Sequence, residues 1–434
     1  MPSIKPFKGI IYNKEKIKDI AMVVAPPYDV ISPKMQDALY KKHKNNVVRL
    51  ILGKIKNTDD KRDNRYVRAK EFFESWLNEN ILIKDDLPCI YIYSQKYKYD
   101  DKWTERVGFI SLMKLELKKK RAVLPHENTL KAPKVDRLSL LRCVKANISP
   151  IFMLYEDDKH KVSSILKNIS KKTKPFISID IDNVRHRAWK LIDPRVSEKI
   201  ENFMEPKDVF IADGHHRYEA AVNYANEIER QAIAPQGLKD SSKYFMAYFC
   251  ELDDETLTIL PTHRLIKDIG HLKREDIVKK LDEFFIVEKA ASAKKLLDRL
   301  NDLKDRHAFG MYLGRDGFYV VTLKKYNLAQ SCMGKNSKEW KGLDVAVLHL
   351  FVIQNVLGIR DEDDNIEFVK DAEEALRLVD KGGFKIAFFL NPTKVTQVKK
   401  VAKIGEKMPR KATYFYPKPL SGLIINEFCN GLNL

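Results

Sequence analysis

The chain has 434 residues, of which 44% are hydrophobic and 10% aromatic. Its length and apolar content exclude a largely disordered protein and predict about two or three folded units. Lys and Arg outnumber Asp and Glu, 79 to 60, which gives a formal net charge of +19. This excess favours an anionic partner, but the lysines are scattered and do not alternate with aromatic residues as in a nucleic-acid stacking platform.

The cysteines and the apolar segments bear on the cellular compartment. Five cysteines lie far apart without a CxxC pair, which predicts free thiols in a reducing, cytoplasmic setting. The lysine-rich N-terminus does not have the pattern of a signal peptide. The most apolar stretch, 343–359, contains Asp344 and His349, and we expect a buried helix there rather than a membrane span.

The first part of the chain alternates between expected helices and short strands. A helix begins after Ser32, a suitable N-cap, with Pro33 at its first position. The other elements expected are a helix at 67–77, strands at 89–93 and 106–115, a buried strand at 207–212 followed by a helix, and strands at 244–250 and 257–260.

A second series of elements follows from about residue 270. It comprises helices at 274–284, 292–303, 373–378 and 396–403, and strands at 285–288, 308–313, 317–323, 366–369, 385–390 and 414–416. We therefore expect a mixed α/β and α+β protein, with an α/β unit over 1–270 and a smaller α+β unit over 271–434.

The sharpest motif lies between the buried strand at 207–212 and the helix after it. Gly214 permits a backbone conformation that other residues resist, and a helix N-terminus favours a bound phosphate. His215, His216 and Arg217 add hydrogen-bond donors, and Asp213 could coordinate a magnesium ion that bridges phosphates. We interpret the motif as an anion site; the alternative is that Asp213 is only a helix N-cap.

Other polar residues could contribute to the same site. Asp29 lies in a rigid Pro-Pro-Tyr-Asp turn, where it is either a turn residue or a contact to a substrate ammonium group or a metal. His263 and Arg264 directly follow a strand. The segment with Arg410, Lys411 and Thr413 is either a solvated basic turn or a phosphate-binding loop from the second domain.

The stretch ADGHHRYEAA resembles the nucleotide-phosphate box of the ParB/sulfiredoxin-like superfamily, in the form found in its free-serine kinases (SerK-type enzymes). The chain as a whole resembles the domain-of-unknown-function family 1015. The stretches that carry this second resemblance are APPYDVIS near the start, HENT with DRL and NISP, LPTHR, and MPRKATYFYPK near the end.

The resemblance implies a fold, an activity and residue roles. It implies a ParB/sulfiredoxin-like, nucleotide-binding catalytic domain with insertions over 1–270, and a second domain over 271–434 that could complete the site. In the serine kinases, the glutamate of a short His-Glu element is the base that takes the serine proton, and Glu127 matches it in type. Asp213 would contribute to catalysis, and residues 214–217 would hold nucleotide phosphates. His126, Thr129 and Arg137 lie in or near the same element and are substrate-binding candidates. The longer interval between Glu127 and Asp213 implies an insertion.

We therefore hypothesise a cytoplasmic kinase that transfers phosphate from ATP or ADP, with Mg²⁺, to a small metabolite, free L-serine first. A membrane or nucleic-acid partner is not expected, and a homodimer is compatible with the sequence. The alternatives are a nucleotide-dependent (CTP or ATP) regulatory protein acting on DNA, and a nucleotide phosphohydrolase. A zinc hydrolase built on His126, His215, His216 and His263 is less favoured, because adjacent histidines rarely bind one ion from a helix start.

Overall fold

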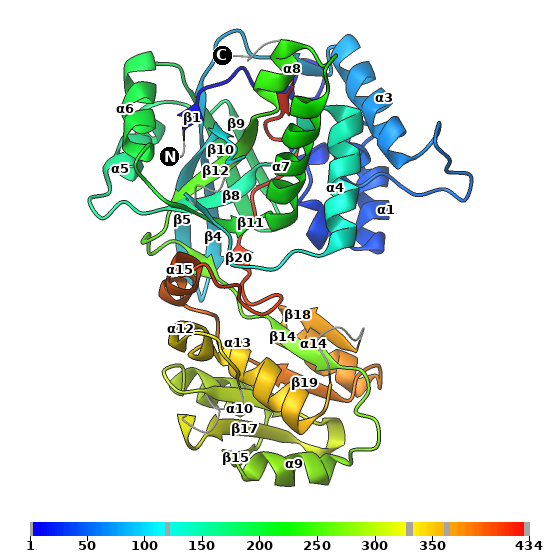
Figure 1. Ribbon diagram of the computed structural model, residues 1–434, viewed down its shortest axis with the longest axis vertical. Helices are drawn as coiled ribbons and strands as arrows, with labels where there is room; N and C mark the ends of the chain where they lie inside the picture. The colour runs from blue at the N-terminus through cyan, green and yellow to red at the C-terminus, as the bar shows by residue number, and fades with distance from the viewer. Residues whose placement is uncertain (1–2, 118–121, 327–332, 360–364, 429–434) are drawn as a thin grey trace. The chain divides into compact units, whose positions relative to one another are not determined.

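The computed structural model describes residues 3–117, 122–326, 333–359 and 365–428, and the chain divides into two compact units (Figure 1). The first unit comprises Met1–Pro125, Thr129–Leu257 and Pro417–Leu434, and the second comprises His126–Asn128 and Thr258–Tyr416. Among the cysteines, Cys332 and Cys429 lie outside the described residues, whereas Cys89, Cys143 and Cys250 are free thiols. Residues 118–121, which are three lysines and an arginine in sequence, are also outside them.

This division differs from a boundary at residue 270. The two strands that follow residue 257 pair with strands of the second unit, so residues 258–270 belong there. The last eighteen residues return to the first unit, and a three-residue segment of the N-terminal part joins the second. Hydrophobic periodicity reports local elements and carries no signal for such long-range exchanges.

The first unit contains one large mixed sheet with helices against it (Figure 1). The strands of the first unit, which include the separate pairs β2-β3 and β21-β7, are β1 (Ile4–Lys5), β2 (Ile10–Tyr12), β3 (Leu82–Lys84), β4 (Ile90–Tyr99), β5 (Lys102–Lys114), β6 (Val123–Leu124), β7 (Ala146–Asn147), β8 (Ile151–Tyr155), β9 (Ile177–Ile181), β10 (Val184–Leu191), β11 (Val209–Asp213), β12 (Tyr244–Glu251) and β21 (Asn426–Glu427). Its helices are η1 (Ile20–Met22), η2 (Tyr28–Val30), α1 (Pro33–Lys42), α2 (Val48–Ile51), α3 (Arg65–Asn78), α4 (Lys131–Val144), α5 (Lys161–Lys172), α6 (Pro194–Met204), α7 (His215–Arg230) and α8 (Gln236–Ser241).

The nine-stranded sheet has the order β6-β11-β8-β12-β5-β4-β10-β9, with β1 paired to β5. Two pairings are parallel, β11 with β6 and β12 with β8, and the rest are antiparallel. One face packs its apolar side chains against α5, α6 and α7. Beside α7 runs α4. The expected mixed α and β fold class is confirmed, and the ParB-like assignment of the first unit stays a prediction.

Segments from the two ends of the chain hydrogen-bond to side chains on the sheet. The N–H of Gly9 donates to the Tyr91 hydroxyl (2.7 Å). The guanidinium of Arg106, which is fully buried, donates to the carbonyl of Pro417 and to Gln95. Arg106 also lies over the ring of Phe152, 4.7 Å from its centroid. A buried cation therefore fixes the C-terminal segment on the sheet.

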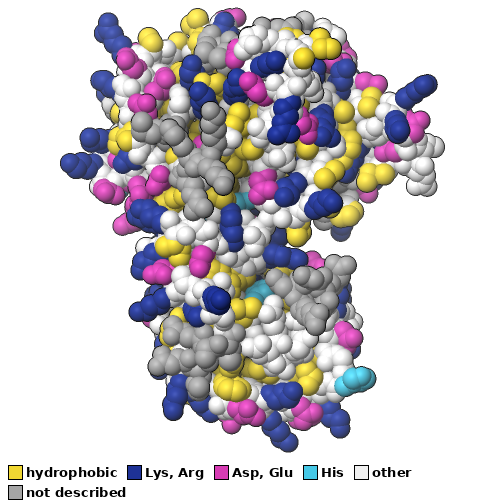
Figure 2. All heavy atoms as spheres, viewed as in Figure 1, with side chains coloured by type: hydrophobic (Ala, Val, Ile, Leu, Met, Phe, Trp, Pro, Cys, Tyr) yellow, Lys and Arg dark blue, Asp and Glu magenta, His cyan; other side chains and the backbone are white. Residues whose placement is uncertain are grey.

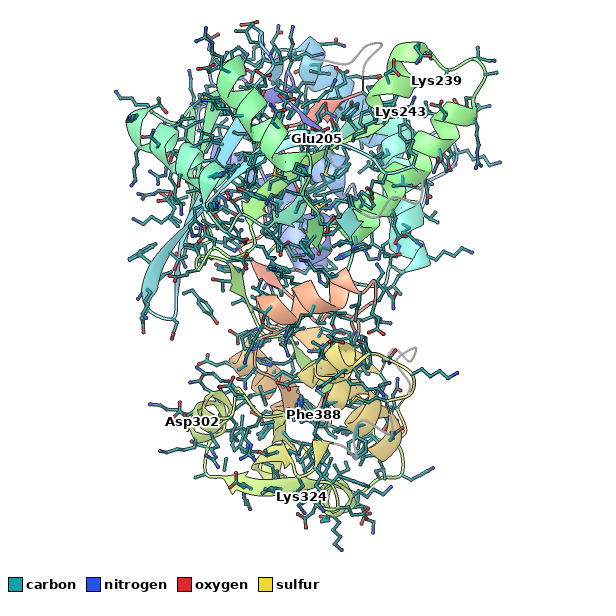
Figure 3. The ribbon with its side chains drawn as sticks, turned by 60° about the vertical axis from the view of Figure 1, so that its left-hand side comes forward. Glu205, Lys239, Lys243, Asp302, Lys324 and Phe388 are labelled. Carbon is teal, nitrogen blue, oxygen red and sulfur yellow. The ribbon has the colours of Figure 1, made fainter. Side chains whose placement is uncertain are left out.

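The second unit has a six-stranded sheet of order β15-β17-β16-β19-β14-β18. Its strands are β13 (Thr258–Ile259), β14 (His263–Ile266), β15 (Phe285–Ala290), β16 (Ala308–Tyr312), β17 (Phe318–Leu323), β18 (Ile366–Val369), β19 (Ile386–Phe389) and β20 (Phe415–Tyr416). Its helices are α9 (Arg274–Asp282), α10 (Ala293–Asp302), η3 (Gly314–Asp316), α12 (Lys338–Lys341), α13 (Asp344–Ala346), η4 (Val347–Val356), α14 (Ala372–Asp380) and α15 (Val395–Lys403). Phe388, labelled in Figure 3, is a buried residue of β19.

The apolar stretch at 343–359 is buried, as expected, but it forms the short helix α13 followed by the π-helix η4. Within the described ranges, no helix combines the length and hydrophobicity needed to cross a bilayer. On the face shown in Figure 2, Lys and Arg side chains are dispersed, with Asp and Glu between them. The positive charge therefore does not gather into one patch on that face.

We predict that Arg106→Met lowers the free energy of unfolding of the first unit by about 3 kcal/mol, because it leaves a buried carbonyl and a buried amide oxygen without their donor. Arg185→Met is the matched control: Arg185 pairs with Asp180, but both side chains are more than half exposed (54% and 64%). Its cost should stay below about 1 kcal/mol. Urea unfolding followed by circular dichroism measures both, and equal costs would contradict the structural role of Arg106.

Candidate functional site in the first unit, with associated residues in the second

The junction between β11 and α7 lies where the motif predicted it. Residues 209–212 of β11 are buried, and the strand ends at the partly exposed Asp213, with a shift in its register against β8 just before that residue. Gly214 follows with φ of 98°, in the left-handed region that favours glycine. It is the N-cap of the sixteen-residue helix α7 and provides no side-chain hydrogen bond to the first turn. The positive end of the helix dipole thus lies directly beside the Asp213 carboxylate.

Arg217 folds back over this turn. Its Nη2 donates to Oδ2 of Asp213 (2.5 Å), and its Nη1 donates to the carbonyl oxygen of Pro150. A Cβ added to Gly214 would lie 2.9–3.0 Å from the guanidinium atoms. The backbone angle therefore requires the glycine, and a Cβ there would also displace the Arg217 guanidinium from its present position. Arg217 orients Asp213 in this structure, and its predicted phosphate contact stays a prediction.

The other carboxylate oxygen of Asp213 has a partner that the sequence did not indicate. Lys418 places its Nζ 2.5 Å from Oδ1 of Asp213 and also contacts Oδ2 of Asp29. The Lys418 and Asp213 side chains are 8% and 13% exposed. Lys418 is the last residue of the MPRKATYFYPK stretch that carries the family resemblance, but that stretch does not indicate its partners, which only the tertiary fold identifies. The structure brings together Asp29 and Asp213, the two carboxylates that sequence analysis singled out separately.

Arg137 supports the turn that carries Asp29. Its guanidinium lies over the Tyr28 ring, 3.9 Å from the centroid, and donates to Asp136 and to the carbonyl of Ile51 (2.8 Å). Burial raises the pKa of Tyr28 to about 12, against the opposing effect of the Arg137 charge, so the phenol is neutral at physiological pH. A cavity of about 50 Å³ is lined by both Arg137 and Arg217, together with apolar residues of α4 and α7.

The two histidines of the motif differ in environment. His215 is buried, at 4% exposure. His216 is half-buried, and its Nε2 accepts a hydrogen bond from the N–H of Leu130 (2.9 Å). Thr129 donates to Glu219 of α7 (2.8 Å). The segment before α4 is thereby attached to the start of α7, and Thr129 lies within the first unit next to the motif.

The His-Glu element belongs to the second unit. His126 is buried, and its Nε2 lies 2.9 Å from the Thr413 hydroxyl. Glu127 pairs with Met408 in a short parallel bridge, and its Oε1 accepts from the N–H of Lys411 (3.2 Å). The structure therefore brings the predicted base together with the predicted loop at 410–413. Their roles as base and phosphate contacts stay predictions.

Arg264 holds the backbone of that loop by hydrogen bonds. It is fully buried, and it donates from NH2 to the carbonyls of Lys411 (3.0 Å) and Arg410 (3.4 Å) and from Nε to His349 (3.1 Å). His263 is also buried, and its Nδ1 accepts from the N–H of Leu390 (3.4 Å). Both residues hydrogen-bond to backbone groups of the second unit, and their predicted contact with substrate stays a prediction.

The predicted site residues thus form one cluster within each unit. The first-unit cluster comprises Asp29, Thr129, Arg137 and residues 213–217, with Lys418 added by the structure. The second-unit cluster comprises His126, Glu127, His263, Arg264, Arg410, Lys411 and Thr413. In the described part of the chain, no group of three His, Cys, Asp or Glu side chains could hold a metal ion.

The contact between Gly214 and Arg217 predicts a coupled effect on stability. Gly214→Ala should cost about 1–2 kcal/mol from its positive φ, and more from the clash with the guanidinium. In the Arg217→Ser background the clash is absent, so the cost should fall by at least about 0.5 kcal/mol. Thermal unfolding of the two single variants and the double variant measures this coupling. Purely additive costs would show that the close contact is not present in solution.

Burial, aided by the neighbouring Arg264 charge, lowers the pKa of His263 to about 4. The unfolded chain binds this proton near pH ~6.5, so the stabilisation is present above that pH and is lost as the pH falls toward 4. We expect the His263 ring to stay neutral at pH 5.5 in histidine-selective NMR spectra. A protonation midpoint near 6.5 would contradict its buried position.

Comparison with known proteins gives one family match and several distant structural ones. A conserved hypothetical protein from Pyrococcus furiosus is 12% identical, with 69% of this chain and 89% of that chain covered and a TM-score of 0.34. A free serine kinase variant in complex with ADP is 13% identical, with 73% and 91% covered and a TM-score of 0.35. SbnI with a C-terminal truncation, from Staphylococcus aureus, is 11% identical, with 71% and 85% covered and a TM-score of 0.33.

None of the curated proteins compared with the chain matches it. Residues 4–346 match the family described as "Protein of unknown function (DUF1015)". That match covers well over half of the sequence, and the chain belongs to this family.

Proposed function

We propose that this protein is a phosphotransferase that moves a phosphoryl group from ATP or ADP to the hydroxyl group of a small metabolite, with free L-serine as the first acceptor to test. The observation that carries the proposal is the turn at Asp213 and Gly214. It combines a strand-end carboxylate, a left-handed glycine and the N-terminal end of a long helix, with two cationic side chains on the carboxylate.

The chemistry of phosphoryl transfer asks for positioning and for neutralisation of charge more than for covalent participation by the protein. The start of α7 would hold the anionic phosphates, since its dipole and amide groups favour negative charge. Arg217 and Lys418 fix the Asp213 carboxylate beside that point, so the acceptor and donor would meet a pre-ordered set of charges.

The acceptor hydroxyl must lose a proton as its oxygen bonds to phosphorus and the nucleotide leaves. Glu127 is our proposed recipient on the resemblance of the His-Glu element to that of the serine kinases, because a carboxylate can act as a general base. In the second unit, its Oε1 accepts a hydrogen bond from the N–H of Lys411, which holds the side chain in place. Asp29 is the next carboxylate to test if Glu127 is dispensable.

The residues around Asp213 do not fit a metal ion held by the protein alone. Oδ1 of Asp213 contacts the Lys418 ammonium group and Oδ2 accepts from Arg217, so cationic side chains engage both oxygens. Magnesium would therefore arrive with the nucleotide phosphates, and no step of the proposed transfer is assigned to a resident ion.

Incubation of the purified protein with L-serine, Mg²⁺ and either ATP or ADP tests the proposal, with O-phosphoserine measured by mass spectrometry. We expect product with at least one nucleotide. Asp213→Asn should lower kcat by about 100-fold or more, and Glu127→Gln by about 100- to 10,000-fold. The matched control is Asp180→Asn, which removes an exposed carboxylate of β9 and should leave the rate unchanged.

Two results would contradict this assignment. Phosphate release at the same rate with and without any hydroxylated acceptor would identify a nucleotide phosphohydrolase. Absence of product from a folded protein, with every common nucleotide and a panel of hydroxylated amino acids and sugars, would remove the phosphotransferase assignment.

A further inference from the structure

Lys418 is held in place by the backbone on which it lies. Its carbonyl accepts from the side-chain amide of Gln95 (3.1 Å), and the preceding carbonyl accepts from Arg106. Two residues later, the N–H of Leu420 donates to the Tyr93 hydroxyl (3.4 Å). The segment is therefore fixed to the sheet of the first unit, and the lysine side chain extends from a rigid base.

The ammonium group of Lys418 bridges two carboxylates. Its Nζ lies 2.5 Å from Oδ1 of Asp213 and is hydrogen-bonded to Oδ2 of Asp29. The exposed fractions of the three side chains are 8% for Lys418, 13% for Asp213 and 25% for Asp29. Since both oxygens contact one nitrogen, they are close enough to share a single cation. Two oxygens converging on one point is also the arrangement in which carboxylates hold a divalent ion.

Charge balance explains why the cation here is a lysine. Asp29 and Asp213 bring two negative charges, and Lys418 and Arg217 bring two positive charges, all mostly buried. A divalent ion added to this set would meet two protein cations at short range, which strongly disfavours its binding. Removal of Lys418 would take away the cation that bridges the two partly buried carboxylates, and that loss favours uptake of an ion.

We propose that Lys418 is the resident cation of this site, and that its ammonium group occupies the position at which Asp29 and Asp213 would otherwise bind a divalent metal ion. The nucleotide-free protein consequently binds no metal ion between these carboxylates. Lys418 acts as a positioning residue, because it keeps Asp213 oriented beside the start of α7. The binding statement stands by itself, whereas the consequence for turnover rests on the proposed function.

The test is a titration of the nucleotide-free, full-length protein with Mn²⁺. Electron paramagnetic resonance of the free ion measures how much Mn²⁺ is bound. The wild-type protein should show no saturable site below about 1 mM that depends on Asp213, as judged with the Asp213→Asn variant. Lys418→Met should gain one site with a Kd of about 0.1–1 mM, the range of weak carboxylate sites. Lys418→Arg keeps the charge and should not gain it, and Lys418→Met combined with Asp29→Asn should lose it again.

Lys243→Met is the matched control. Lys243, labelled in Figure 3, also lies between two carboxylates, 3.1 Å from Glu229 and 3.9 Å from Asp240, but its side chain is 27% exposed. This variant removes the same charge from the same unit. Any Mn²⁺ binding that it gains should be at least about tenfold weaker than that of Lys418→Met, because solvent already screens the two carboxylates.

A saturable Mn²⁺ site in the wild-type protein that disappears in Asp213→Asn would overturn the proposal, and this result needs no lysine variant to fold. A folded Lys418→Met protein without Mn²⁺ binding would also overturn it. Neither measurement involves turnover, so the proposed kinase activity can fail while the assignment of Lys418 holds. If the kinase activity is found, Lys418→Met should lower kcat by about tenfold or more while Lys418→Arg retains most of it.

Discussion

The Asp213 carboxylate is the point on which the first-unit cluster depends. One oxygen accepts from Arg217, one turn into the following helix, and the other contacts Lys418, from the last part of the chain. Lys418 in turn reaches Asp29 in the N-terminal turn. Three segments far apart in the sequence therefore meet through the Lys418 side chain. Buried charges of this kind are costly unless each is paired, so the cluster is stable only when all of its members are present.

The arrangement of the sheet explains why those segments meet. β11 ends at the position where the chain must turn into α7. A glycine at position 214 allows both the turn and the close approach of Arg217. Side chains of the sheet hold the two ends of the chain through Tyr91 and Arg106. The fold thus delivers a carboxylate, a helix end and a fixed ammonium group to the same place.

Local patterns in the sequence were sufficient for the motif. The apolar strand before Asp213, the glycine and the one-sided helix after it predicted a strand-turn-helix junction, and the structure has β11, Gly214 and α7 there. The sequence could not show the partners of Lys418, since tertiary folding sets them and spacing along the chain does not. It also could not show that His263 and Arg264 are buried, because a strand end looks the same whether its polar residues face solvent or a loop.

The compact units differ from a division at residue 270 for the same physical reason. The boundary at 270 assumed that a continuous stretch of chain forms each unit, whereas the segments at 126–128 and 417–434 pair with strands and side chains remote in sequence. Such exchanges explain how a glutamate from the N-terminal half and a loop near residue 411 come together in the second unit. Interpretation of Glu127 as a base depends on this placement as well as on its chemical type.

In the proposed function, nucleotide phosphates bind at the turn formed by residues 213–217. A crystal structure of the protein grown with ADP and Mg²⁺ would show where they bind. We expect the terminal phosphate of the nucleotide at the first-turn amide groups of α7, beside Asp213. Electron density for ADP in a different pocket, with this turn unchanged and without a ligand, would contradict this expectation.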